Sequence, residues 1–368
     1  MWRTIMKLQV TQENLSRALA AVGKIASGRN TLPILSNVLL STVDNRLRLA
    51  ATNLEVAITE TIGAKVSQEG TITVPARLLQ DLVNAIPDGV ITMELTDNKL
   101  LITTDGYESV INGTSAEEYP VMPALKDGSS LAIPTAIFKK TLQQVVGAAS
   151  SDDARPILTA VYLHSHEGDL YAVATDSYRL AEKRIQACKE AVSLLIPASS
   201  LQDVLRILQD DSNDVVVTYD DLQARFVVGD VELITRLIDG NYPDYRKLIP
   251  LEFKTSAVVK KSDFVNITKV SSLFAREVAG SVTLKVDGTD NQLSIRSVAS
   301  QLGENTARAT AEATGSGDVT LNSRYLLDAL AVLGGDKVGF FINGKLDPVV
   351  LRDPSQEDYT HVVMPVKS

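Results

Sequence analysis

The sequence predicts an α+β protein of three repeated domains, each with two helices packed on antiparallel strands. Two observations lead to this prediction. Landmarks recur at a nearly constant period along the 368 residues, and helical and strand-like periodicities alternate within each repeat. A chain of this length exceeds one ordinary hydrophobic core and suits two or three domains.

Three kinds of landmark define the repeat. The first is a strand-like run that ends in a polar turn, the second opens a helix, and the third is a closing segment that contains Tyr and Pro. Their spacings lie between 122 and 125 residues, measured from Thr52 to Thr175, Pro75 to Pro197, Pro120 to Pro243 and Pro197 to Asn322. Because boundaries follow the first two closing segments, we predict domains over residues 1–128, 129–255 and 256–368.

Each repeat contains two segments with helical periodicity. In LLQDLVNAI the apolar side chains from Leu78 to Ile86 recur at a spacing that places them on one helical face. We predict helices over residues 12–27, 76–86, 135–149, 199–209, 260–274 and 323–333.

Strands are predicted between these helices, where apolar and polar residues alternate. The clearest examples are VITMEL (90–95), KLLITT (99–104), VVVTYD (215–220), QARFVV (223–228) and SVTLKV (281–286). Asp and Gly in GDVEL and DGNYP supply turns between them.

The charge distribution bears on nucleic-acid binding. The net charge of −9 argues against a general nucleic-acid binder. The six predicted helices nevertheless hold ten basic and five acidic residues, whereas the rest of the chain holds 26 basic and 40 acidic. Helices that face one surface could then bind a DNA backbone without reading sequence. An amphipathic helix always needs a polar face, so chance remains an alternative explanation.

Targeting signals and cysteines indicate a cytoplasmic protein. No apolar run reaches the roughly 18 residues of a membrane span, and the N-terminal segment lacks the features of an export signal. One cysteine, Cys188, has no partner for a disulfide and fits a reducing compartment. We expect no membrane association.

Motifs for catalysis or cofactors are scarce. His164 and His166 share one face of a predicted strand, but no third metal ligand stands nearby, so a solvated strand is the favoured interpretation. Asp152 and Asp153 could hold Mg²⁺, but a loop cap is the more common role of such a pair. No P-loop, GxSxG or GxGxxG motif occurs. We expect no catalytic residue, metal or cofactor.

Four segments carry a resemblance to a known family. They are GRNTLPILSNVLL (28–40), VATDSYRLA (173–181), LIDGNYPDYRKLIP (237–250) and YTHVVMPV (359–366). From Met6 onward, the chain resembles the beta subunit of bacterial DNA polymerase III, the DNA sliding clamp. The resemblance implies the DNA clamp fold and a homodimer closed head to tail into a ring around duplex DNA. It also implies that the ring tethers the replicative polymerase, and that the clamp loader and repair proteins bind as well.

The resemblance further implies two sets of binding residues. The DNA-contacting positions of the family fall on Arg29, Arg77, Asp152, Pro156 and Ile157. The pocket that binds partner peptides maps onto Leu158, Thr175, Ser177, Tyr178, Arg179, Leu180, Pro243, Lys247, Leu248, Asn322, Tyr325, Val362, Met364, Pro365 and Val366. Leu, Val, Met and Pro would form an apolar slot for a short peptide tail, with Arg179 and Lys247 at the rim.

This chain departs from the family pattern at several of these positions. Asp152 stands where a polar amide is often found, and Pro156 where an aromatic residue is common. The pair Ser177-Tyr178 replaces a more usual Gly-His, and the chain ends in Lys-Ser rather than Arg-Leu. The peptide preference is therefore expected to differ from that of relatives.

Two other kinds of protein fit a repeated α+β chain. An enolpyruvyl-transferase-like enzyme is also built from repeated units, but it needs converging Lys, Arg and acidic residues for a phosphorylated substrate, and the sequence offers no such set. A repeat-built interaction protein without a DNA role is the second alternative. Retention on circular but not linear DNA would separate a clamp from both.

Overall fold

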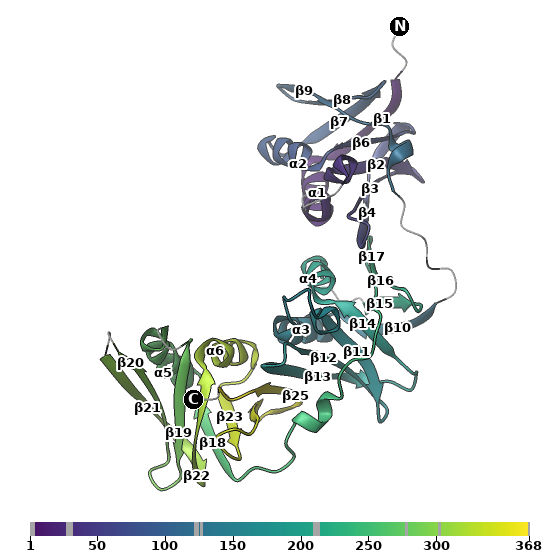
Figure 1. Cartoon of the computed structure of the whole chain (residues 1–368). Helices are drawn as coiled ribbons and strands as arrows, with labels where there is room; N and C mark the ends of the chain where they lie inside the picture. Colours follow the sequence, from purple (N-terminus) through teal and green to yellow (C-terminus); the bar gives the residue numbers. More distant parts are fainter. Residues whose placement is uncertain are drawn as a thin grey trace. The chain divides into compact units, whose positions relative to one another are not determined.

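The chain forms two compact units in a computed structural model that describes residues 4–26, 32–120, 125, 128–208, 214–276, 279–300 and 303–366 (Figure 1). The N-terminal unit comprises Met1–Ala136 and Gln202–Leu237, and the C-terminal unit comprises Ile137–Leu201 and Ile238–Ser368. The middle predicted repeat therefore contributes to both units.

The N-terminal unit contains two antiparallel sheets. The first has the order β5-β1-β7-β8-β9, with strands at Lys65–Gln68, Thr4–Thr11, Val90–Thr96, Lys99–Thr104 and Tyr107–Asn112. The second has the order β10-β15-β16-β17-β4-β3-β2-β6, with strands at Ser129–Pro134, Asp214–Tyr219, Gln223–Val228, Val231–Arg236, Val56–Gly63, Arg46–Thr52, Asn37–Val43 and Thr71–Pro75. Helix α1 (Gln12–Ala26) packs against α2 (Ala76–Ala85) and lies on β3 and β4.

The C-terminal unit contains one twelve-stranded antiparallel sheet. Its order is β14-β11-β12-β13-β25-β24-β23-β18-β21-β20-β19-β22, with strands at Ser193–Pro197, Ala160–His166, Asp169–Thr175, Arg179–Ala187, Gln356–Val363, Val349–Asp353, Lys337–Ile342, Thr255–Lys260, Gly303–Thr314, Gln292–Ala299, Ser281–Asp287 and Ser316–Asn322. Helices α5 (Lys261–Phe274) and α6 (Ser323–Val332) pack together, and α5 lies on β20 and β21.

The two remaining helices belong to the middle repeat. They are α3 (Thr135–Val145) and α4 (Ala198–Ile207). Short 3-10 helices occur at η1 (Pro33–Ser36), η2 (Ala116–Glu118), η3 (Val146–Ala148), η4 (Pro156–Thr159) and η5 (Tyr245–Leu248). All six predicted helices are thus confirmed, although α3 ends at Val145 and is followed by η3, and the predicted end residues Ser27 and Gln209 lie outside the described residues.

The helix openers have a common local cause. Pro75 and Pro197 end the strands β6 and β14, and a helix begins at the next residue in both cases. Proline fixes its own φ and lacks an N–H, so it cannot donate a hydrogen bond to a neighbouring strand. At the start of a helix no intrahelical partner is needed for that N–H, so proline is well tolerated there. In the third repeat Asn322 takes this place, and its side chain accepts a hydrogen bond from the Arg324 N–H at 2.9 Å.

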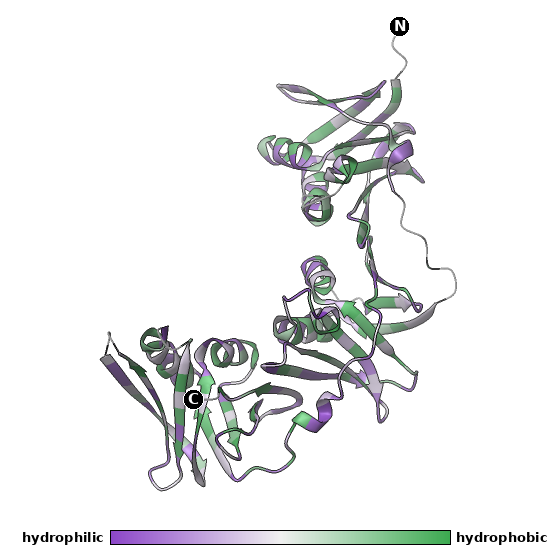
Figure 2. Cartoon of the chain, in the orientation of Figure 1, coloured by the Kyte–Doolittle hydropathy of each residue, from purple (hydrophilic) through white to green (hydrophobic). Residues whose placement is uncertain are grey.

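The core lies where the helices cover the sheets. In α2 the residues Leu79 and Val83 are buried, as is Ile86 just after the helix, which the apolar pattern predicts. Leu78, at the edge of this face, is 53 % exposed. Figure 2 shows the mixture that results, with hydrophobic and hydrophilic stretches on each helix.

No helix in the described part of the chain is long and apolar enough to cross a membrane.

Candidate functional site

The candidate peptide site is built around a turn in the C-terminal unit, between β12 and β13. Thr175 Oγ1 donates to the Arg179 carbonyl at 2.6 Å, and Asp176 Oδ1 accepts from the N–H groups of Tyr178 and Arg179 at 2.9 Å each. Ser177 has φ of +77°, in the left-handed region that favours glycine. Side-chain hydrogen bonds within the turn hold this left-handed residue in place.

The same turn occurs in the first repeat. Thr52 Oγ1 donates to the Val56 carbonyl at 2.9 Å, Asn53 Oδ1 accepts from the Val56 N–H at 2.8 Å, and Leu54 has φ of +77°. The recurring Thr of the sequence repeat is therefore the residue that closes the turn in both copies. Of the two copies, the one after Thr175 carries the predicted binding residues.

An aromatic and charged cluster lies beside the Thr175–Arg179 turn. The ring of Tyr178, which is 58 % exposed, stacks against Tyr325 of α6 with centroids 6.3 Å apart. The Arg179 guanidinium lies 4.8 Å from the Tyr325 ring centroid and forms ion pairs with Asp176 at 3.0 Å and Asp328 at 2.5 Å. Burial raises the pKa of Tyr325, with Asp176 adding to the shift and Arg179 opposing it.

The C-terminal segment completes this side of the site. Strand β25 pairs with β13, with Val362 opposite Leu180 and Val363 opposite Arg179. Beyond the strand, the Met364 N–H donates to the Tyr178 carbonyl at 2.8 Å, and the Val366 N–H donates to the Thr320 carbonyl at 2.9 Å. Met364, Pro365 and Val366 are half-buried and run from the turn toward the start of α6.

The connector (residues 242–249) supplies the opposite side. Pro243, Lys247 and Leu248 on this segment are exposed, and Leu248 shows 45 % of its surface. Between them, Tyr245 is buried in a hydrophobic cluster with Val173, Leu180, Val350 and Val362. The cluster joins the connector to the floor of the candidate slot.

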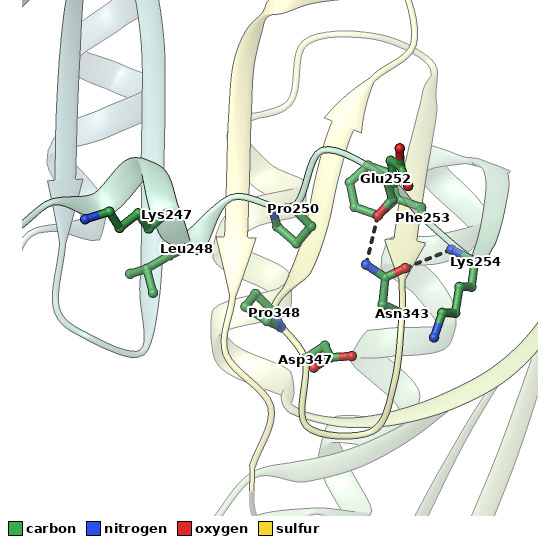
Figure 3. Close-up of a pocket in the computed structure, with 9 residues that line it drawn as sticks. All are labelled: Lys247, Leu248, Pro250, Glu252, Phe253, Lys254, Asn343, Asp347 and Pro348. Carbon is green, nitrogen blue, oxygen red and sulfur yellow. Dashed lines mark hydrogen bonds between the residues drawn. The ribbon is translucent and has the colours of Figure 1, made fainter.

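A groove of about 520 Å³ adjoins the connector (Figure 3). Asn343 fixes its shape, because its Nδ2 donates to the Glu252 carbonyl and its Oδ1 accepts from the Lys254 N–H, both at 2.8 Å. The groove is lined by Lys247, Leu248, Pro250, Glu252, Phe253, Lys254, Asn343, Asp347 and Pro348. It thus starts at two residues of the predicted pocket.

The predicted pocket residues divide into a floor and a surface. Leu158, Thr175, Leu180 and Val362 are at most 8 % exposed, so they support the slot from beneath. The prediction of Arg179 as a rim charge was wrong, since its side chain is 13 % exposed and fully engaged with two carboxylates. Lys247, with a side chain 81 % exposed and 2.6 Å from Asp244, is the accessible cation of the pair.

Of the residues predicted to contact DNA that the structure describes, Arg77, Asp152 and Pro156 are exposed and Ile157 is half-buried. Arg77 on α2 has a side chain 89 % exposed, with Asp81 3.9 Å away. Asp152 Oδ1 accepts from the Ala154 N–H at 3.0 Å, so this acidic residue caps a turn. Pro156 opens η4 and is exposed, and Ile157 lies against Gly240. Arg29 lies outside the described residues.

The expectation of a solvated strand at His164 was wrong. His164 is 7 % exposed, its ring stacks on Tyr162 at 4.4 Å, and its Nε2 lies 2.9 Å from the Tyr245 hydroxyl. Burial lowers the pKa of His164 to about 4, so the ring is neutral near pH 7. His166 is partly exposed beside Glu167. Alternation on a strand places residues on one face but does not say which face another segment covers.

His361 is a second buried histidine. It lies on β25 next to Val362, and its Nδ1 is 2.8 Å from the Tyr359 hydroxyl. Burial lowers the pKa of His361 to about 3, and the Arg179 charge adds to this shift. In the described part of the chain, no three His, Cys, Asp or Glu side chains gather as a metal site would require.

Sequence reasoning missed the polar residues under the slot. Glu182 accepts a hydrogen bond from the Tyr245 hydroxyl at 2.5 Å, and Asp328 holds Arg179. The sequence gives a weak signal that Tyr245 is buried, because in the segment NYPDYRKLIP this aromatic residue stands between the polar Asp244 and Arg246. Nothing local indicates Asp328, whose partner lies 149 residues away.

The fold and the site define a repeat-built scaffold with a partly apolar groove beside the connector. The chain belongs to the family of DNA polymerase III beta subunits, whose N-terminal, central and C-terminal domain models match residues 6–123, 132–244 and 246–367. Relatives described as beta sliding clamp include those of Bacillus subtilis, 29 % identical over 99 % of this chain and all of the relative, and of Synechocystis sp., 32 % identical over 98 % and 99 %.

Solved structures agree with this assignment. The sliding clamp of Bacillus subtilis superposes with a TM-score of 0.94 at 28 % identity, covering 99 % of both chains. The sliding clamp of Bartonella birtlesii, solved bound to griselimycin, has a TM-score of 0.94 at 27 % identity, covering 99 % of this chain and all of that one. The prediction of three repeated clamp domains is confirmed, and the enolpyruvyl-transferase-like alternative gains no support.

Proposed function

We propose that this chain is a DNA sliding clamp, which encircles duplex DNA as a head-to-tail ring of two chains and tethers the replicative DNA polymerase. The match of three clamp domains over residues 6–367 is the observation that carries the proposal. The role is processivity rather than catalysis, and it is exercised in the cytoplasm, where the polymerase and its template are.

The ring explains how an acidic protein holds DNA. A closed ring retains duplex by topology, so contacts with phosphates need only be weak and independent of sequence. Exposed cations such as Arg77 suit this task, because their side chains reach into solvent rather than pairing in the core. Arg29, Asp152, Pro156 and Ile157 complete the proposed DNA-facing set. Strong phosphate contacts would hinder sliding.

The slot in the C-terminal unit is proposed to receive short tails of partner proteins. Its half-buried Met364, Pro365 and Val366 and its exposed Leu248 offer apolar contacts to a peptide that orders on binding. The stacked rings of Tyr178 and Tyr325 supply an aromatic surface at one end. The polymerase catalytic subunit, the clamp loader and repair proteins are the proposed partners.

We also propose domain boundaries near residues 128 and 255. The family models leave a gap between residues 123 and 132, which supports the first boundary. At the second boundary the central and C-terminal family models meet at residues 244–246, before the predicted position, whereas strand β18 begins at Thr255 after the connector.

Retention on circular DNA tests the clamp function directly. The protein, loaded by its own loader with ATP on a nicked plasmid, is expected to co-elute with the DNA in gel filtration and to be released when one restriction cut linearises the plasmid. A ring slides off a free end, whereas a protein held by charge alone does not. Equal retention on both forms would refute encirclement, and the uncut plasmid incubated with the same enzyme buffer is the control.

A further inference from the structure

The connector is one of the parts of the slot that lie outside the sheet. It carries Pro243, Lys247 and Leu248, and the short helix η5 within it spans only Tyr245–Leu248. A segment this short has little stability of its own, so side-chain anchors must hold it in position. Among the residues of the connector, Tyr245 is the one that is buried, at 3 % exposure.

Polar contacts fasten Tyr245 to two adjacent strands. Its hydroxyl donates to Glu182 Oε2 on β13 at 2.5 Å, and His164 Nε2 on β11 lies 2.9 Å from the same oxygen. Burial and the Glu182 charge raise the pKa of Tyr245, so its single proton stays available for Glu182. His164 completes the relay as the neutral Nε2–H tautomer, which leaves its Nδ1, 3.4 Å from the Ser165 carbonyl, without a proton to donate there.

Arg246, the next residue, connects the connector to a third strand. The Arg246 guanidinium lies 4.5 Å from the ring centroid of Tyr171 on β12 and 3.4 Å from Glu182. Glu182 therefore receives both the Tyr245 hydroxyl and the Arg246 cation. Because β11, β12 and β13 are neighbours in the sheet, these contacts fix the connector in two directions across its surface.

The ring of Tyr245 links this relay to the slot. It packs with Leu180 and Val362, which form part of the slot floor, as well as with Val173 and Val350. Lys247 and Leu248 follow two and three residues later in the same short helix. Any displacement of Tyr245 thus moves the exposed side chains of the connector relative to the floor.

We propose that Tyr245, through its hydroxyl relay to Glu182 and His164, is the residue that positions the connector wall of the peptide slot. The inference rests on the proposed function for its consequence in binding. Tyr245 does not touch the peptide in this arrangement, so it is a positioning residue that acts through Lys247 and Leu248.

Tyr242 offers a matched control for the test. It lies on the same connector, and its ring stacks on Tyr162 with centroids 5.0 Å apart. Its buried hydroxyl makes no hydrogen bond of standard geometry within the described part of the chain, although the nearby Thr175 backbone partly offsets the rise that burial causes in the pKa of Tyr242. Tyr245→Phe and Tyr242→Phe therefore remove the same atom from the same segment. Only the first breaks a hydrogen-bonded relay.

Two measurements on the full-length protein decide the proposal. The first is hydrogen exchange of residues 245–249 in the free protein, expected to speed up about tenfold in Tyr245→Phe and to stay unchanged in Tyr242→Phe. The second is anisotropy of a fluorescein-labelled peptide copied from the tail of the polymerase catalytic subunit. Affinity is expected to fall about five- to tenfold in Tyr245→Phe, through faster dissociation, and less than twofold in Tyr242→Phe.

A second variant guards against misfolding. Glu182→Gln keeps an acceptor for the Tyr245 hydroxyl but removes the charge beside Arg246, so its exchange rate is expected to lie between those of wild type and Tyr245→Phe. Wild-type exchange in both relay variants would overturn the proposal, as would equal acceleration in Tyr242→Phe. Failure of the wild-type protein to bind the peptide would contradict the proposed function of the slot. The exchange data would still show whether Tyr245 positions the connector.

Discussion

Arg179 has a structural setting that its sequence context did not predict. Its basic side chain in an apolar set suggested a rim charge, but it lies between two carboxylates and a tyrosine ring. Its partner Asp176 is also largely buried, with 14 % of its side chain exposed. Arg179 therefore joins the Thr175–Arg179 turn to helix α6 through its ion pairs with Asp176 and Asp328.

Replacement of Arg179 by alanine is expected to destabilise the C-terminal unit by about 2–3 kcal/mol, because it leaves Asp176 buried without its cation. Thermal unfolding followed by calorimetry would measure this loss. Arg77→Ala is the control, since its exposed pair with Asp81 at 3.9 Å contributes less than about 0.5 kcal/mol. Equal effects of the two substitutions would contradict the buried role of Arg179.

The starts of helices could be predicted from the sequence, whereas the pairing of strands could not. Helix starts followed from local chemistry, as at Pro75, Pro197 and Asn322. Strand pairing did not, because β17 joins β4 and β13 joins β25 across about 170 residues of sequence, and alternation within a strand says nothing about its neighbour. The burial of His164 was missed for the same reason, since the connector that covers it is distant in sequence.

The end of β25 sets the limit for a useful truncation. Val362 pairs with Leu180 on one side and Val350 on the other, so its removal would break the middle of the sheet. Met364, Pro365 and Val366 lie beyond the strand, and backbone hydrogen bonds join Met364 to Tyr178 and Val366 to Thr320.

Deletion of residues 364–368 is expected to lower peptide affinity more than tenfold, about 1.4 kcal/mol or more, since apolar anchors dominate small interfaces. Fluorescence anisotropy would measure the affinity, and light scattering would check that the oligomeric mass is unchanged. Deletion of residues 367–368 alone is the matched control. Undiminished peptide binding by the shorter, intact protein would refute the role of this segment in the slot.

At the scale of the whole molecule, three repeats predict how chains assemble. Three similar domains supply half of a sixfold ring, and a chain with two different ends closes such a ring by head-to-tail contact with a second copy. The charge distribution fits this arrangement, because the basic excess of the helices would face the enclosed DNA and the acidic remainder the solvent.

Light scattering in moderate salt is therefore expected to give about twice the 39.7 kDa mass of the chain at micromolar concentration. The physical reason is that a clamp must stay closed to retain DNA. A dilution series would follow the dissociation of the ring, with a standard of known mass as reference. A species of single-chain mass throughout the series would speak against the ring.

The sheet pairings also bear on how such a protein can evolve and be dissected. Main-chain hydrogen bonds between β17 and β4, and between β13 and β25, cross both seams between successive repeats. A repeat cut out at its sequence boundaries would expose these strand edges to solvent, and open edges recruit other chains. Duplicated segments joined in this way are free to diverge in sequence, but we expect each one alone to associate with other chains through its open strand edge.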